Sequence, residues 1–145
     1  MKFSHVLIMA STLAFFACGG DDDSPTSAKS GYDCTVSDGV KVVYPAGGET
    51  FKVGETIDVV FGTTVAGESY SVAFRKAQND GNKDLFEESF DLTAPADGKT
   101  CHTVKVKLDA ARGVEATQTG YLRVYPYDSQ RKGAVNAKPF TVVKE

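Results

Sequence analysis

Apolar and polar residues alternate with a period of two from about residue 40 to residue 144, and this pattern constrains the fold more than any other feature. The clearest case is residues 103–108, where Val104, Val106 and Leu108 alternate with polar residues. Such alternation sets one face of a β-strand against a core and leaves the other face in water. No segment carries the apolar stripe of an amphipathic helix. We therefore expect an all-β domain.

Several short segments share this period and are separated by turn-forming Gly, Pro, Asn and Asp residues. Short strands at such spacing predict an antiparallel sandwich of about seven strands. Residues 109–117 contain two adjacent alanines, but Gly113 limits any helix there, so we expect this segment to cross between the two sheets. The expected strands cover residues 40–44, 56–61, 70–74, 85–92, 103–108, 121–125 and 140–143.

Residues 1–17 have the pattern of a secretory signal peptide, with Lys2 followed by an apolar run over residues 6–17. That run would measure about 18 Å as a helix, which is too short for a hydrocarbon core of about 30 Å. Residues 14–18 (AFFAC) resemble a bacterial lipobox, in which the cysteine, here Cys18, is acylated with diacylglycerol and becomes the first mature residue. The alternative is an ordinary signal peptide that ends near a cysteine.

Residues 18–31 contain no large apolar side chain after Cys18, so we expect them to form a flexible tether between the lipid and a domain at 32–145. The acidic run 21–23 resembles the export signal that some Gram-negative groups use to place lipoproteins on the outer surface. The alternative is a solvated charge run that binds nothing.

The whole chain has a net charge of −3, with 19 acidic against 16 basic residues. Because the signal peptide contains one cation, Lys2, and no acid, the mature chain would have a net charge of −4. A protein that grips nucleic acid needs a basic surplus, so we expect no nucleic-acid partner. The membrane contact would come from acyl chains rather than from charge.

Three cysteines leave an even pair once Cys18 is acylated, and we expect Cys34 and Cys101 to form a disulfide in an oxidising compartment. The alternative is two separate thiols. A zinc site is not expected, because no Cys-x-x-Cys spacing occurs and His102 is the single histidine after the signal peptide.

The residues offer no catalytic set, so we expect no enzyme activity and no cofactor. His102 falls on the apolar side or at the start of its strand, as a buried and hydrogen-bonded histidine would. Glu87 and Glu88 are adjacent and would point to opposite faces of a strand, so they cannot flank one bond. Residues 80–84 place oxygen ligands at alternate positions, but Leu85 takes the place of the glycine of a calcium loop. A hairpin turn at residues 79–82 is expected instead, because Asp, Asn and Gly tolerate a positive φ.

Motifs spread over the domain resemble one family of extracellular proteins. Residues 45–51 (PAGGETF), 53–56 (VGET) and 57–61 (IDVVF) are followed near the C-terminus by 121–124 (YLRV) and 139–142 (PFTV). These motifs resemble the first and last strands of the Ser/Thr-rich, GPI-anchored cell-wall family, whose founding members include the yeast β-glucan-assembly proteins. The resemblance implies an immunoglobulin-like or fibronectin-like module without catalytic residues.

The combined prediction is a surface-exposed outer-membrane lipoprotein whose domain is a non-catalytic binding or structural module of the cell envelope, with an envelope protein or polysaccharide as partner. The alternative is a carbohydrate-binding module. In that case Tyr121, Tyr125 and Tyr127 would lie on one outward face as a stacking platform for sugar rings, with Arg123 between them. The competing interpretation is that these tyrosines pack along the edge of the sandwich.

Overall fold

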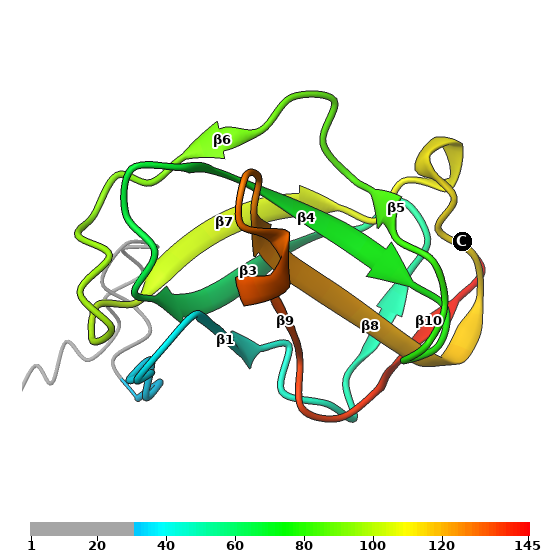
Figure 1. Cartoon of the computed structure of the whole chain (residues 1–145). Coiled ribbons are helices and arrows are strands. Elements are labelled where there is room, and N and C mark those ends of the chain that lie inside the picture. The colour runs from blue at the N-terminus through cyan, green and yellow to red at the C-terminus, as the bar shows by residue number, and fades with distance from the viewer. Residues whose placement is uncertain (1–30) are drawn as a thin grey trace, which may run out of the picture. The chain divides into compact units, whose positions relative to one another are not determined.

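Two β-sheets pack face to face in the computed structural model, which describes residues 31–145 (Figure 1). The predicted signal peptide, Cys18 and the tether up to residue 30 lie outside the described residues. Residues 31–145 form one compact unit. In this part of the chain no helix is long and apolar enough to span a membrane.

The first sheet has three antiparallel strands in the order β1–β3–β7. They are β1 (Val40–Tyr44), β3 (Thr56–Thr63) and β7 (His102–Lys107). Asp58 of β3 lies opposite Lys105 of β7, and their side chains form an ion pair of 3.0 Å on the outside of this sheet.

The second sheet has the order β2–β10–β8–β4–β5, and within it only β2 and β10 run parallel. Two further short strands, β6 and β9, pair with β4 and β8. The strands are β2 (Thr50–Lys52), β4 (Ser69–Arg75), β5 (Lys83–Asp84), β6 (Phe90–Asp91), β8 (Thr117–Pro126), β9 (Ala134–Val135) and β10 (Phe140–Val143).

This strand order is that of an immunoglobulin-like or fibronectin-like sandwich, as predicted. The three strands β1, β3 and β7 take the places of strands A, B and E, while β5, β4, β8 and β10 take those of C′, C, F and G. The crossover expected at residues 109–117 joins β7 of the first sheet to β8 of the second and contains the short 3₁₀ helix η1 (Ala110–Arg112).

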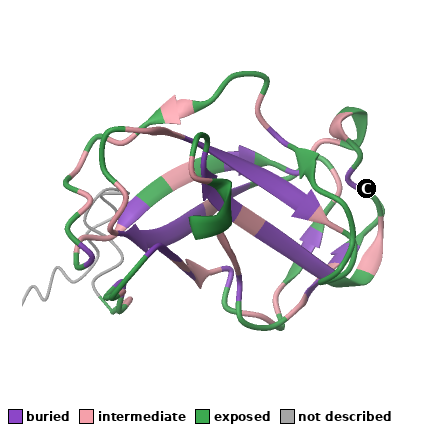
Figure 2. Cartoon of the chain, in the orientation of Figure 1, coloured by how far each residue is buried: buried purple, intermediate pink, exposed green. Residues whose placement is uncertain are grey.

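The core lies between the sheets and is built from alternate residues of the long strands (Figure 2). Phe61 of β3 and Tyr70 of β4 are fully buried, with ring centroids 5.8 Å apart. Burial of side chains of this size stabilises the fold by about 1.5–3 kcal/mol each. The other fully buried apolar side chains of large volume are Val59, Val60, Val72, Phe74, Val106, Leu108, Leu122, Val124, Phe140 and Val142.

The prediction of one continuous strand over residues 85–92 is wrong, because only Phe90–Asp91 of this span is a strand. β5 and β6 pair with the two ends of β4, and the chain between them leaves the sheet. Phe86 and Phe90, whose spacing suggested a strand face, instead pack against each other with centroids 5.4 Å apart. Two aromatic residues four positions apart do not by themselves distinguish a strand from a loop that folds back on the core.

The loop of residues 76–82 joins antiparallel strands β4 and β5, so the predicted hairpin is present. Its backbone differs from the expected one, because no residue in this loop has a positive φ. A hydrogen bond of 3.0 Å from the Asp80 amide to the Ala77 carbonyl closes the turn. The strands β2 and β9 were not expected, since each is three residues or fewer.

Candidate functional site

The outer face of the β4–β8 pair contains most of the residues that the sequence suggested for sugar binding. The register sets Tyr121 opposite Arg75 and Arg123 opposite Ala73, while Tyr125 lies opposite Ser71. Because the alternate residues Leu122 and Val124 are buried in the core, these side chains project from the opposite face of the sheet.

The structure does not bring three exposed tyrosine rings together. Tyr121 is 8% exposed and Tyr125 is 4% exposed, whereas Tyr127, beyond the end of β8, is 57% exposed. The Tyr125 hydroxyl donates a hydrogen bond of 2.6 Å to Asp84 on β5, so its ring lies across β4. Tyr121 and Tyr125 therefore do not provide the stacking platform for sugars, and Tyr127 alone presents a ring.

The chain after β8 covers Tyr125. A Cβ atom at Gly133 would lie 2.5 Å from the Cβ of Tyr125, so the backbone of this segment approaches the tyrosine as closely as a glycine allows. The guanidinium carbon of Arg123 lies 5.0 Å from the centre of the Tyr125 ring, in a cation–π arrangement. Tyr125 therefore packs against the Arg123 guanidinium and exposes little surface to a ligand.

Arg75 and Arg123 form a pair of cations on this face. Arg123 donates to the carbonyl of Gln130, and Arg75 donates to Asn82 Oδ1 at 2.7 Å and to the Gln78 carbonyl at 2.9 Å. Burial lowers the pKa of Arg123 below its ordinary value, and the neighbouring charge of Arg75 lowers this pKa further. Both guanidinium groups are therefore held by neutral oxygens while they repel each other.

A shallow hollow lies beside this pair, in the loop that follows β8. It is lined by residues 127–132, which include the exposed ring of Tyr127 and the short 3₁₀ helix η2 (Gln130–Lys132). Gln130 links the two features, since it lines the hollow and accepts the hydrogen bond from Arg123. Lys132 is neutralised by an ion pair of 2.7 Å with Asp38.

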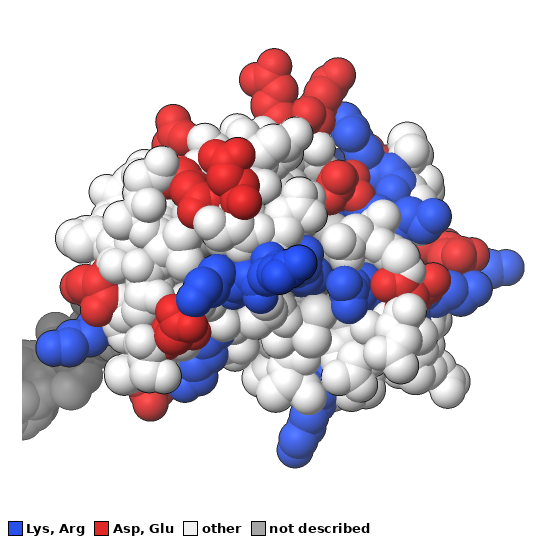
Figure 3. All heavy atoms as spheres, viewed as in Figure 1, with Lys and Arg blue, Asp and Glu red and all other residues white. Residues whose placement is uncertain are grey.

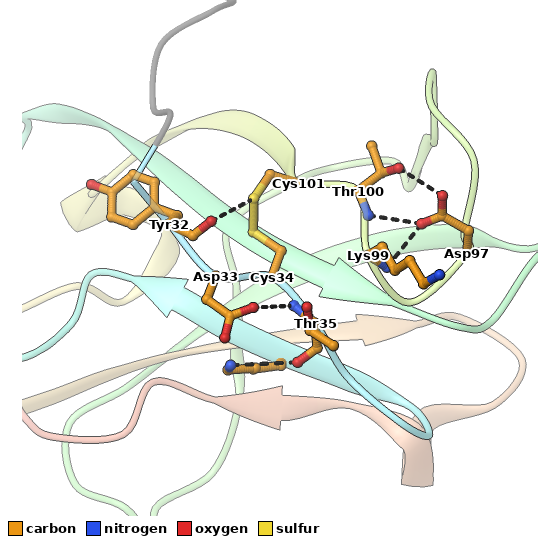
Figure 4. The surroundings of a disulfide bond; sticks show 9 residues. Tyr32, Asp33, Cys34, Thr35, Asp97, Lys99, Thr100 and Cys101 are labelled. Carbon is orange, nitrogen blue, oxygen red and sulfur yellow. Dashed lines mark hydrogen bonds between the residues drawn. A yellow bond between two sulfur atoms is a disulfide. The ribbon is translucent and has the colours of Figure 1, made fainter.

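A disulfide joins Cys34 to Cys101, as predicted (Figure 4). Cys34 is only 2% exposed and crosses the outer face of β3 at Gly62, where a Cβ atom would lie 1.9 Å from the Cys34 carbonyl oxygen. The segment is also held by a hydrogen bond of 2.9 Å from the Val36 amide to the Gly98 carbonyl. The disulfide therefore fixes the start of the described chain onto the β3–β7 pair.

His102 at the start of β7 is 6% exposed, and its ring stacks on Phe61 with centroids 5.3 Å apart. Burial lowers its pKa, partly offset by a hydrogen bond with the backbone of Pro95 and by the charge of Asp97. Its Nε2 atom is buried and makes no hydrogen bond within residues 31–145. The prediction of a buried histidine is confirmed. Only one of its two ring nitrogens has a hydrogen-bond partner within residues 31–145.

Glu87, which the sequence suggested, and Asp97, whose charge acts on His102, are each engaged with other groups. Glu87 lies 3.7 Å from Arg112 in an exposed ion pair. Asp97 accepts hydrogen bonds from the amides of Thr100 and Lys99 and from the Thr100 hydroxyl, which lower its pKa to about 2. Within the described part of the chain, no group of three His, Cys, Asp or Glu side chains is placed to hold a metal ion.

Comparison of the chain with models of known protein families finds no match, and comparison with curated proteins finds no significant relative. The resemblance to the GPI-anchored cell-wall family therefore stays a prediction. The sequence missed Arg75 as a candidate, because only the pairing of β4 with β8 brings it beside Arg123.

Proposed function

We propose that this protein is a lipoprotein of the cell envelope, acylated on Cys18, whose sandwich acts outside the cytosol as a non-catalytic binding or structural module. In this proposal residues 1–17 are removed, and residues 18–31 hold the sandwich away from the membrane. The acidic run 21–23 directs it to the outer surface of the outer membrane.

The observation that carries the proposal is the disulfide between Cys34 and Cys101. Disulfides form and persist in oxidising compartments and are rare in the cytosol, which favours an exported chain. The bond uses both cysteines outside the lipobox, so Cys18 remains as the one thiol for acylation. The compact unit starts at residue 31, where the predicted tether ends.

The non-catalytic part of the proposal rests on the environment of His102. The ring is buried against Phe61, and its lowered pKa favours the neutral form. A general base has to reach its substrate within hydrogen-bonding distance, and a ring that is 6% exposed has little surface for this. Display of loops and sheet faces is the role that this architecture supports best.

Two measurements on cells test the proposal. Growth with a labelled fatty acid should label the wild-type protein and leave the Cys18→Ser variant unlabelled, with Cys34→Ser as the control that keeps the lipobox. Protease added to intact cells should digest the wild-type domain if it is on the surface. Replacement of all three aspartates of the 21–23 run by alanine should protect the domain from the protease while the label remains. Equal labelling of the wild type and the Cys18→Ser variant would refute the anchor.

A further inference from the structure

We propose that Arg75 and Arg123 form a binding site for the carboxylate or sulfate groups of an acidic polysaccharide, on the outer face of the β4–β8 pair. This inference deepens the proposed function, on which it rests for access to polymers outside the cell. The fold alone implies neither a binding site nor a class of ligand.

The first argument is the arrangement of charge. No carboxylate lies within ion-pair distance of Arg75 or Arg123 among residues 31–145, where four of the fourteen Lys and Arg side chains have such a partner. The strongest charge effect on Arg123 comes from Arg75. A polyanion that contacted both guanidinium groups would offset this repulsion by attraction.

The second argument is the hydrogen bonding of the two guanidinium groups. A guanidinium carries five N–H groups. Within residues 31–145, Arg75 uses only Nε and Nη1, and Arg123 uses only Nη2. The bonds to Asn82, Gln78 and Gln130 orient both groups without neutralising them. Free N–H groups on oriented guanidiniums match the paired oxygens of a carboxylate or sulfate.

The nearby carboxylates form no ion pair with Arg75 or Arg123 within residues 31–145. Asp84 lies in register with Arg123 but two strands away, on the far side of Ala73, which separates their backbones by about 9–10 Å. It also accepts the hydrogen bond from Tyr125. Glu68 accepts hydrogen bonds from the Asp128 amide and the Ser129 hydroxyl. Asp128 lines the hollow rather than the arginine pair.

The hollow beside the pair favours a sugar polymer over other polyanions. Tyr127 offers an exposed ring there, and the apolar face of a sugar stacks well on such a ring. Figure 3 shows a short row of basic side chains across the face that β4 and β8 occupy in Figure 1, with acidic side chains near both ends of the row. Because the mature protein would have a net charge of −4, a polyanion is attracted locally rather than everywhere.

The test is binding of the detergent-solubilised full protein to immobilised polygalacturonate, dextran sulfate, unmodified dextran and polyglutamate, at low and at high ionic strength. We expect salt-sensitive binding to polygalacturonate, to dextran sulfate or to both, which tells a carboxylate site from a sulfate site. Unmodified dextran and polyglutamate should bind at least about tenfold more weakly.

The double variant Arg75→Gln with Arg123→Gln should lose at least about tenfold in affinity. The matched control, Lys99→Gln with Lys107→Gln, removes two exposed cations that have no ion pair within residues 31–145 and should bind as the wild type does. A second double variant, Arg75→Lys with Arg123→Lys, keeps both positive charges and tests whether the paired N–H groups of arginine are needed. It should bind more weakly than the wild type.

Equal binding of wild type and the glutamine double variant, when both unfold at the same temperature, would overturn the site. Equal loss in the lysine-to-glutamine control would show that total charge alone acts, and tighter binding to polyglutamate would overturn the choice of a polysaccharide. None of these results depends on acylation, so the site can fail while the anchor stands, and the labelling experiment can fail while the site stands.

Discussion

Removal of the Cys34–Cys101 disulfide is the perturbation whose size the structure predicts best. The two cysteines are 67 residues apart in the sequence. Release of a cross-link over a loop of that length gives the unfolded chain additional entropy worth roughly 4 kcal/mol at 25 °C. That is a large part of the roughly 5–15 kcal/mol that is typical of a whole domain.

The double variant Cys34→Ala with Cys101→Ala should therefore unfold in urea with a free energy about 4 kcal/mol below that of the oxidised wild type. In a thermal scan the midpoint should fall by on the order of 15 °C. Wild-type protein treated with a reductant should behave like the double variant, while the reductant should leave the double variant unchanged. The loss of two small side chains adds little, since the segment keeps its hydrogen bond from Val36 to Gly98.

A loss of less than about 1 kcal/mol in the double variant would refute this reasoning. It would mean that the unfolded chain already holds the two segments together, so that the bond restricts little. A result near the predicted value would identify the bond as a main stabilising element of the domain and strengthen the case for an oxidising compartment.

Three further predictions concern stability. Because burial lowers the pKa of His102 below 6.5, the unfolded chain takes up this proton more readily. The contribution of neutral His102 to the free energy of unfolding should be fully present above pH 6.5 and should decline as the pH falls toward the folded-state pKa. In the variant His102→Phe, the free energy of unfolding measured in urea should fall less between neutral and mildly acidic pH than it does in the wild type. Gly62→Ala should cost about 2 kcal/mol or more, since its Cβ would meet the Cys34 carbonyl, whereas Gly81→Ala, with open space around it, should change stability by less than about 0.5 kcal/mol. Tyr70→Phe should cost about 1–2 kcal/mol, because its buried hydroxyl bonds to Thr63 Oγ1 at 2.8 Å and to the Val65 carbonyl; an unchanged unfolding midpoint would contradict this.

The fold was predictable where local pattern and burial agree. Residues 103–108 alternate between core and water, and the structure places Val106 and Leu108 in the core with the lysines outside. β3 departs from this rule, because Val60 on its outer face is fully buried as well. The N-terminal segment around Cys34 crosses that face at Gly62, two residues further along. Such cover depends on contacts between distant segments, which a local pattern does not contain.

The candidate site shows the same limit. Alternation correctly placed Tyr121, Arg123 and Tyr125 on one face of β8. It did not show that the segment containing Gly133 would cover Tyr125. Nor did it show that Arg75 would come to lie beside Arg123, since these residues are 48 positions apart and meet through strand pairing. The cysteine pair was predictable because parity and compartment left one partner for each residue.

The central claim is that the mature protein begins at Cys18 and is held outside the cytosol by acyl chains on that residue. Mass spectrometry of the N-terminal peptide from protein isolated out of the native envelope tests it most directly. The predicted peptide starts at Cys18 and is heavier than its sequence mass by a diacylglycerol group. A peptide that starts at Met1, or one that starts at Cys18 with a free thiol, would contradict the claim.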